Sequence, residues 1–403
     1  MVAPLSGIRV VEVSNWLAAP SAAALMADLG ADVVKVEPPG GDAFRHFDMR
    51  AFGYDHDFVT NAAFELDNRG KQSIVVALDR PGGPELVKRL AEDADVFITN
   101  LVQHRRERYG LTVEDVQAVN DGLVYVSFSG YGTDGPDADR AGFDYAAFWA
   151  RSGIMGLMGE PPSSPPICRP GQGDQTTALN LLASTLAALR MRDQTGEGQV
   201  VDVTLLGTGI WTIGPDLSAV LQAHQHPPRH ERSHPANPIW NPYRCSDDRW
   251  LLLVMPQPDR YWPPFCEMVE RPEWVSDERY DTLVHRMEHS EQLTAEIDAI
   301  FASAGLATWA QRLDAAGLIW APVAELPEVV DDPTVRALGS FAEVEHPEFG
   351  SFETLAAPFK IRGADLAPRG PAPALGQHTQ AVLEELGLDA DELAELAVAG
   401  VFG

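Results

Sequence analysis

The sequence predicts an α/β protein whose larger part is an open, mostly parallel sheet covered by helices. Two observations support this fold class. Short apolar, β-branched runs such as residues 8–13 and 32–37 alternate with helical patterns through the first 130 residues. Each pair of consecutive runs is separated by a helix, so we expect parallel strands joined by right-handed crossovers. Such alternation is typical of a Rossmann-like, doubly wound sheet.

The expected elements of this sheet region follow one another at short intervals. The predicted strands cover residues 8–13, 32–37, 73–78, 95–99, 123–127 and 199–205. The predicted helices cover residues 21–29, 83–93, 112–119, 176–192 and the segment from the last strand to about residue 223. Gly30 ends the first helix, and the sequence Pro-Pro-Gly-Gly at 38–41 ends the second strand.

A segment rich in Pro and His, residues 227–242, separates the sheet region from a second unit. One strand at 250–255 is followed by helical patterns, which predicts a smaller α+β domain. These helical patterns lie at 262–269, 290–302 and 308–316. The later elements are a helix at 326–338, a β pair at 341–352, an extended stretch at 364–374 and two helices at 377–386 and 391–399. We therefore divide the chain into a large domain over 1–225, a small domain with linkers over 226–330, and a C-terminal segment over 331–403.

Composition excludes several classes of protein. The 403 residues carry a formal net charge of -29, which argues against nucleic acid as a partner because phosphate binding needs a basic face. No N-terminal signal segment is visible, and residues 176–192 are too short and too rich in alanine for a membrane span. Three cysteines without paired spacing predict free thiols in a reducing cytoplasm, and no Cys/His cluster predicts a metal site.

The first strand-to-helix connection lacks the signature of a dinucleotide fold. It consists of Ser-Asn-Trp-Leu-Ala-Ala at 14–19 and contains no glycine. A pyrophosphate-binding turn needs glycine there so that the backbone can approach the ligand. We therefore do not expect NAD or FAD to bind in the usual manner.

The glycine-rich loop at 171–177 precedes a long apolar helical pattern, with Asp174 at the expected N-cap position. An Asp there can simply accept backbone N–H bonds. The same geometry also holds a carboxylate ionised, and an ionised carboxylate can attack an acyl carbon. The flanking glycines would leave room for a bulky group and offer N–H donors to an oxyanion. The loop alone leaves both interpretations open.

Other polar groups follow neighbouring strands. Asn100 ends a strand and is followed by the basic residues Arg105, Arg106 and Arg108, which predict either a solvated helix start or a phosphate site. Asp144 is either a further helix cap or a second carboxylate that faces the same cleft as the glycine-rich loop.

Taken together, these segments resemble the family III CoA-transferases, the CaiB–BaiF family, which includes formyl-CoA transferases and α-methylacyl-CoA racemases. The resemblance extends over nearly the whole chain. Its matching segments are 4–10, 29–37, 68–73, 94–96 leading to Asn100, 173–174, 195–203 and 376–379.

The resemblance implies a Rossmann-like large domain completed by C-terminal residues, a small domain, and a homodimer of two interlinked rings. It implies that Asp174 is the catalytic carboxylate, with Asp144 near the reacting centre. CoA and acyl-CoA would be substrates, with no permanently bound cofactor. The positions that would contact CoA are Leu17, Ala18, Leu78, Arg80, Asn100, Leu101 and Arg108.

Three departures from the family pattern bear on the activity. Racemases carry His where this chain has Phe143, which cannot move a proton, so we favour a transferase. The glycine lid of formyl-CoA transferase is replaced by 236–242, and Pro38 stands where that enzyme uses an arginine. An apolar lid with Trp240, and Phe148 and Trp149 nearby in sequence, would suit a larger or aromatic acyl group, unless these residues belong to the core.

Two alternatives to the transferase remain at this point. One is an acyl-CoA racemase or isomerase that uses Asp174 as a base. The other is a non-catalytic acyl-CoA binding protein that keeps the fold.

Overall fold

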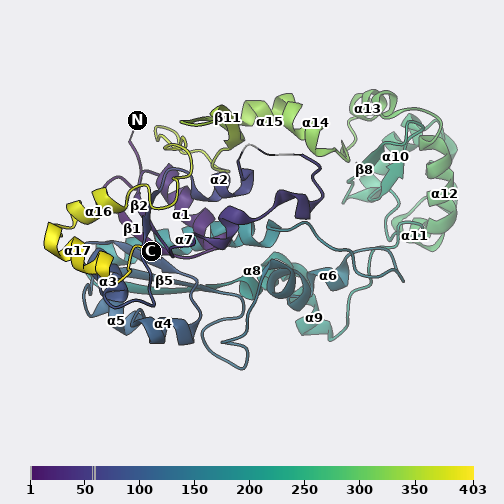
Figure 1. Ribbon diagram of the computed structural model, residues 1–403. Coiled ribbons are helices and arrows are strands. Elements are labelled where there is room, and N and C mark those ends of the chain that lie inside the picture. The colour runs from purple at the N-terminus through teal and green to yellow at the C-terminus, as the bar shows by residue number, and fades with distance from the viewer. Residues whose placement is uncertain (1, 57, 59) are drawn as a thin grey trace. The chain divides into compact units, whose positions relative to one another are not determined.

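The computed structural model describes residues 2–56, 58 and 60–403. Its largest sheet has six parallel strands in the order β3-β2-β1-β4-β5-β6 (Figure 1). The strands are β1 (Arg9–Val13), β2 (Asp32–Glu37), β3 (Gln72–Val75), β4 (Val96–Thr99), β5 (Val124–Ser129) and β6 (Gln199–Thr204). The predicted α/β fold with a parallel sheet is confirmed.

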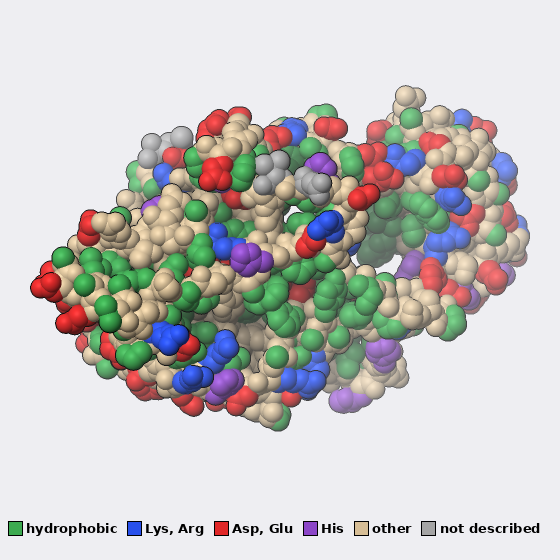
Figure 2. All heavy atoms as spheres, viewed as in Figure 1, with side chains coloured by type: hydrophobic (Ala, Val, Ile, Leu, Met, Phe, Trp, Pro, Cys, Tyr) green, Lys and Arg blue, Asp and Glu red, His purple; other side chains and the backbone are tan. Residues whose placement is uncertain are grey.

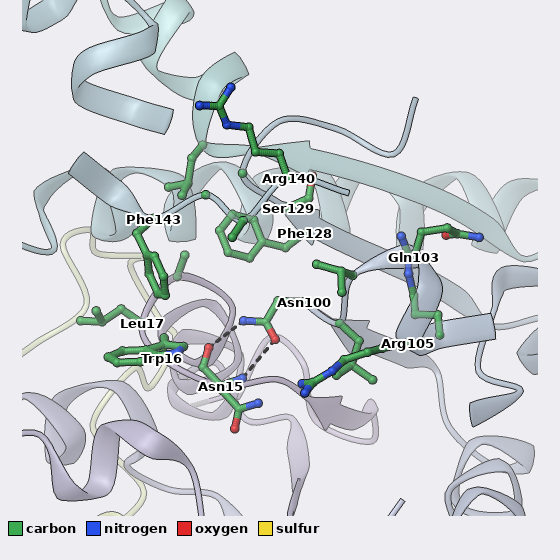
Figure 3. A pocket seen from close by; sticks show the side chains of 18 of the residues that line it. Asn15, Trp16, Leu17, Asn100, Gln103, Arg105, Phe128, Ser129, Arg140 and Phe143 are labelled. Carbon is green, nitrogen blue, oxygen red and sulfur yellow. Dashed lines mark hydrogen bonds between the residues drawn. The ribbon is translucent and has the colours of Figure 1, made fainter. Parts of the chain in front are cut away.

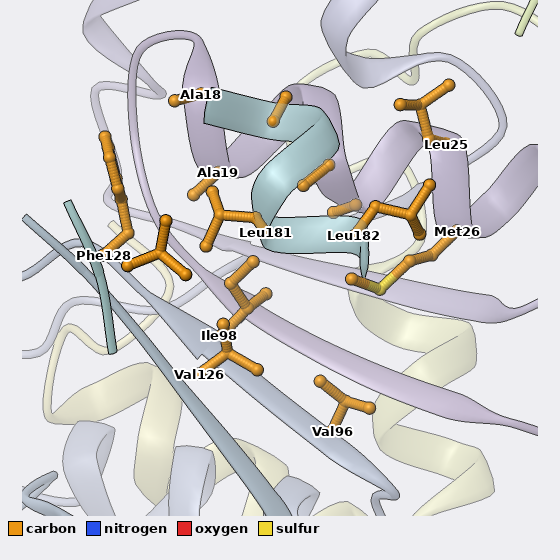
Figure 4. Packing of buried hydrophobic residues seen from close by; sticks show 14 of the residues in the cluster. Ala18, Ala19, Leu25, Met26, Val96, Ile98, Val126, Phe128, Leu181 and Leu182 are labelled. Atoms are coloured by element: carbon orange, nitrogen blue, oxygen red, sulfur yellow. The ribbon is translucent and has the colours of Figure 1, made fainter. Parts of the chain in front are cut away.

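One face of the sheet is covered by α1 (Ala18–Asp28) and α7 (Gln172–Thr195), which pack against each other. Every residue of α1 is buried, and most of its side chains are small, so the helix fits closely between the sheet and α7. Figure 4 shows Leu181 and Leu182 of α7 packed with side chains of α1, β4 and β5.

The opposite face has its own apolar cluster, because side chains alternate along each strand. In β4, Val96 and Ile98 point to the α1 side and Phe97 to the other. The helices that contribute buried residues to this second cluster are α3 (Gly83–Glu92), α5 (Val113–Gln117) and α16 (Thr379–Glu385).

The C-terminal segment belongs to the same compact unit as the sheet. This unit consists of residues 1–155, 167–225 and 336–403. Within the segment, β10 (Phe341–His346) and β11 (Gly350–Leu355) form an antiparallel pair, and α16 and α17 (Ala390–Val398) follow. Figure 1 shows the C-terminal helices beside the purple N-terminal strands.

The second compact unit comprises residues 156–166 and 226–335. Its antiparallel sheet, in the order β7-β8-β9, packs with helices around a separate apolar core. Its elements are β7 (Pro242–Arg244), β8 (Trp250–Leu253), α10 (Pro258–Met268), α11 (Leu283–Glu288), α12 (Ser290–Phe301), α13 (Leu306–Ala315), β9 (Trp320–Pro322) and α14 (Leu326–Asp331).

The structure differs from the predicted elements where proline or glycine intervenes. The single helix expected after β6 is two helices, α8 (Leu205–Thr212) and α9 (Gly214–Ala223), with Pro215 in the first turn of the second. The helix expected at 326–338 is likewise divided by Pro333 into α14 and α15 (Pro333–Leu338).

Several shorter elements were not predicted, because they lack a full period of apolar residues. They are the helices α2 (Ala62–Asn68), α4 (Gln103–Tyr109) and α6 (Ile154–Leu157), the 3₁₀ turns η1 (Ala43–His46), η2 (Met49–Phe52) and η4 (Pro272–Val275), and the π-helix η3 (Tyr145–Arg151).

Acidic side chains are scattered over the visible surface rather than gathered into one patch (Figure 2). Within the described residues, no helix combines the length and apolar character that a membrane crossing requires. The described residues also hold no group of three or more His, Cys, Asp and Glu side chains placed for a metal ion.

Candidate active site

The candidate site lies where the sheet changes its direction of winding. β1 and β4 are neighbours, but the chain leaves them toward opposite edges of the sheet. Crevices at such switch points are the usual ligand sites of open α/β sheets. The two connections are joined there, since the Asn15 N–H donates to Asn100 Oδ1 (3.1 Å) and Asn100 Nδ2 donates to the Asn15 carbonyl (2.7 Å) (Figure 3).

A cavity of about 520 Å³ opens at this point. Its lining changes in character from one side to the other. Trp16, Leu17 and Phe143 gather on one side, and Gln103 and Arg105 lie on the opposite side (Figure 3). A ligand with an apolar part and an anionic part would match this division.

Trp16 is one residue of this lining that the sequence patterns did not assign to the site. It has a left-handed backbone (φ +69°), and its N–H donates to Asp42 Oδ1 (3.1 Å). Its ring meets the Phe143 ring edge-on at 5.4 Å between centroids. Strained backbone of this kind, held by surrounding contacts, is a feature of functional sites.

The predicted N-cap role of Asp174 is wrong. The N-cap residue of α7 is Gly171, which has φ +80°, and Asp174 is the third residue of the helix. Within the described residues, no donor hydrogen-bonds to the Asp174 carboxylate, which lines the cavity. The first turn of a helix favours a negative charge, so the Asp174 carboxylate is suited to this position without a capping partner.

Asp144 holds the glycine-rich loop through a hydrogen bond to its backbone. Its Oδ2 accepts a hydrogen bond from Gly171 N (2.7 Å), and it makes no side-chain cap for η3, the helix that follows it. The Gly171 N–H is therefore engaged by Asp144 and is not aimed at an oxyanion.

Gly173 is required by this packing. A Cβ there would lie 2.3 Å from Asp144 Oδ1 and 2.4 Å from Phe148 Cγ. Both neighbours are buried. Phe148 thus belongs to the core beneath the loop and not to the cavity.

Three carboxyl groups converge at the start of α7. Burial, together with the nearby carboxylates Asp144 and Asp67, raises the pKa of Asp174 to about 7. Burial also raises the pKa of Asp144 to about 6, against the opposing effect of the N–H donors of the loop. Asp174 therefore changes its charge close to neutral pH, where small changes in its surroundings decide its state.

The structure brings together most of the predicted site residues. Those that line one cavity with Asp174 are Leu17, Ala18, Asn100 and Leu101. Leu78 and Arg80 follow β3 and are not part of this lining, and Arg108 lies in the last turn of α4 with its guanidinium over the Tyr109 ring. Of the basic cluster, Arg105 and Arg106 line the cavity.

Phe148 and Trp149, two of the residues suggested for an aromatic acyl pocket, do not line this cavity. Phe148 is buried, Trp149 packs against the main core, and Trp240 belongs to the second unit. The aromatic lining that the structure does provide comes from Trp16, Phe128 and Phe143.

Comparison with known proteins gives a consistent family. The model of CoA-transferase family III matches residues 5–379. The chain is 30% identical over 389 residues to the (R)-2-hydroxy-4-methylpentanoate CoA-transferase of Clostridioides difficile, covering 96% of this chain and 97% of the relative. It is 33% identical over 397 residues to the succinate–glutarate CoA-transferase of Agrobacterium fabrum, covering 95% and 96%.

Solved structures agree with this similarity. A CaiB/BaiF family protein from Brucella suis superposes with a TM-score of 0.85 at 30% identity, covering 96% of this chain and 100% of that one.

Proposed function

The chain belongs to CoA-transferase family III, and we propose that it moves CoA from an acyl-CoA thioester to a free carboxylic acid through covalent intermediates on Asp174. The observation that supports this most directly is the Asp174 carboxylate itself. It lines the cavity at the first turn of α7 and accepts no hydrogen bond from the described residues.

The first half of the reaction uses two displacements at carbonyl carbons. An Asp174 oxygen attacks the thioester carbon, and the C–S bond breaks. CoA leaves as a thiolate, and the acyl group remains on Asp174 as a mixed anhydride. The thiolate then attacks the aspartyl carbon of this anhydride. That step releases the first acid as a carboxylate and leaves an aspartyl-CoA thioester.

The second half reverses these steps with a new acid. Its carboxylate attacks the aspartyl thioester, which gives a new anhydride and the thiolate. The thiolate attacks the acyl carbon, so the new acyl-CoA forms and Asp174 regains its carboxylate. No net proton is consumed, which fits a site without a basic residue beside Asp174 among its charged neighbours.

We expect CoA to enter from the side of the cavity that carries Arg105 and Gln103, where guanidinium groups suit phosphate. Leu17, Ala18, Asn100 and Leu101 line the path from there to Asp174. Contacts from Leu78, Arg80 and Arg108 remain part of the proposal, although these residues lie outside this lining.

The acyl end supports a larger apolar or aromatic group. Trp16, Phe128 and Phe143 supply apolar surface there. Arg140, a cation of the lining, pairs with Asp137 (3.3 Å) and stacks over Tyr131, so it is not free to bind a distal carboxylate. The relatives named above act on a branched hydroxy acid and on dicarboxylates, and the lining favours the first kind.

Trapping of the intermediate tests the proposal. The protein is incubated with acyl-CoA thioesters that carry oxalyl, succinyl, branched and aryl groups, then treated with hydroxylamine and mapped by mass spectrometry. We expect a hydroxamate at Asp174, strongest with branched or aryl thioesters, and a loss of turnover of at least about 10³-fold in Asp174→Ala. Oxalyl transfer faster than all larger groups would contradict the acyl assignment.

The same experiment separates the alternatives. Deuterium exchange at the α-carbon without an adduct would indicate an isomerase that uses Asp174 as a base. CoA binding without adduct or exchange would indicate a binding protein.

A further inference from the structure

A chain of buried and half-buried polar side chains passes through Gln175, the residue next to Asp174. Ser21 Oγ of α1 donates to Gln175 Oε1 (2.7 Å), and Gln175 Nε2 donates to Asp67 Oδ1 of α2 (2.7 Å). Gln175 is the neighbour of Asp174 in α7. Three helices are therefore joined by one amide next to the reacting carboxylate.

Asp67 is the unusual member of this chain. It is fully buried, and its Oδ2 has no hydrogen-bond partner among the described residues. Arg69 follows in sequence but pairs with Asp28 (2.6 Å). A buried carboxylate without a compensating cation is strongly disfavoured, so this group keeps its proton where it can.

The nearby lysines are already committed. Lys71 Nζ lies 2.7 Å from Glu12 Oε2 and donates to the Pro20 carbonyl (2.8 Å) and Asn68 Oδ1 (2.9 Å). Lys35 Nζ pairs with Glu12 (2.8 Å) and Asp42 (2.9 Å). Two ammonium groups thus balance two carboxylates, and no cation in this cluster is left for Asp67.

Resting on the proposed function, we propose that Asp67 is a positioning residue that competes with Asp174 for one negative charge, and so sets the proton affinity of the nucleophile. The cavity and the first turn of α7 favour the charge on Asp174, and the share of it that resides on Asp67 opposes ionisation of Asp174. Gln175, the neighbour of Asp174 in α7, holds the Asp67 carboxyl against this helix.

The direction of the effect follows from the charges that face each group. Asp174 faces Asp144 and Asp67, and burial with these carboxylates raises its pKa to about 7. Asp67 faces Lys71 and Arg69, which oppose the burial that raises its pKa to about 7. Since any negative charge on Asp67 opposes ionisation of Asp174, a neutral residue at 67 lowers the pKa of the nucleophile.

The test is the pH profile of kcat/KM for the acyl-CoA between about pH 5 and 9. Asp67→Asn keeps an acceptor for Gln175 and removes the charge, so we expect the acid limb to move to lower pH by roughly 0.5 to 1 unit. Ser21→Ala removes the hydrogen bond to Gln175 but keeps Asp67. We therefore expect a lower kcat and an acid limb at the same pH as in the wild-type protein. Asp93→Asn, an exposed carboxyl at the end of α3, leaves both unchanged.

Gln175→Glu provides an independent measurement if Asp67→Asn does not fold. It adds a carboxyl beside the pair, so the acid limb moves to higher pH. An unmoved limb in Asp67→Asn, with an Asp174 adduct still formed by the wild-type protein, overturns the role of Asp67 alone. Absence of the adduct in the wild-type protein instead removes the proposed function.

Discussion

At the scale of single residues, Asp174 is held at a cost to stability. The pKa of Asp174 is about 7 in the folded chain against an ordinary value of 3.8. Between these values the folded state binds more protons than the unfolded state, so stability falls as pH rises through this window. A partly desolvated carboxylate that opposes folding fits the nucleophile that we propose.

Gly173→Ala should damage the site through packing alone. The new methyl group would displace Asp144 and Phe148, and with them the loop that positions Asp174. We expect a loss of roughly 1–3 kcal/mol in stability and of roughly 100-fold in kcat, because small shifts of a catalytic group are enough. Thermal melting and steady-state kinetics measure the two effects.

Gly196→Ala, at the other end of α7, is the matched control. Gly196 has φ +75° but open space around its Cβ position. Alanine there costs about 1 kcal/mol of backbone strain and leaves kcat unchanged. If both variants lost activity equally, the loop contacts would not explain the effect.

Sequence could identify some site residues and not others for a physical reason. Asp174 follows a glycine at the start of a long helix, so local pattern and family resemblance both mark it. The roles of Asp67 and Trp16 depend on contacts between segments far apart in sequence, and no local period encodes them. Glu12 and Lys35 were likewise hidden, because they lie inside β-branched strands that read as apolar.

At the scale of elements, the C-terminal segment completes the sheet at the β3 edge. His378 N donates to the Ser73 carbonyl (2.9 Å), and Val75 N donates to Thr379 Oγ1 (3.1 Å). Ala77 N donates to the Val401 carbonyl (2.7 Å). These bonds cover backbone groups that an open sheet edge would expose.

Val401→Asp should therefore weaken the fold, since Val401 is fully buried in the cluster below the sheet. An unpaired carboxylate there costs roughly 3–5 kcal/mol. Val398→Asp changes an almost neighbouring residue that is 91% exposed, and we expect a shift within about 0.5 kcal/mol. Thermal denaturation compares the two, and equal melting points would show that the terminus does not dock.

The sheet strands were predictable because each has a run of apolar residues bounded by turn residues. The points at which expected helices are divided were harder to predict. Pro333 and Pro215 divide helices that the apolar pattern alone joins. The C-terminal docking depends on backbone pairing between residues about 300 positions apart, which only the family resemblance indicated.

At the scale of the whole molecule, one face of the sheet unit remains apolar at its surface. β6 is the edge strand, and α7, α8 and α9 follow or flank it. The exposed apolar side chains on these elements are Leu179, Leu186, Met191, Val200, Ile210, Trp211 and Leu221. An apolar surface beside an open edge is typical of a protein interface.

We expect a second copy of the chain to cover this face, in keeping with the homodimer that the family resemblance implies. Trp211 is 83% exposed and would be a central contact. Trp211→Glu places a charge in the interface, and we expect light scattering after size exclusion to change from the mass of a dimer to that of a monomer. Val398→Glu, which changes an exposed apolar residue on α17, should leave the dimer intact. If Trp211→Glu stayed dimeric, the two chains would have to associate through another surface, and the apolar face would need a different occupant.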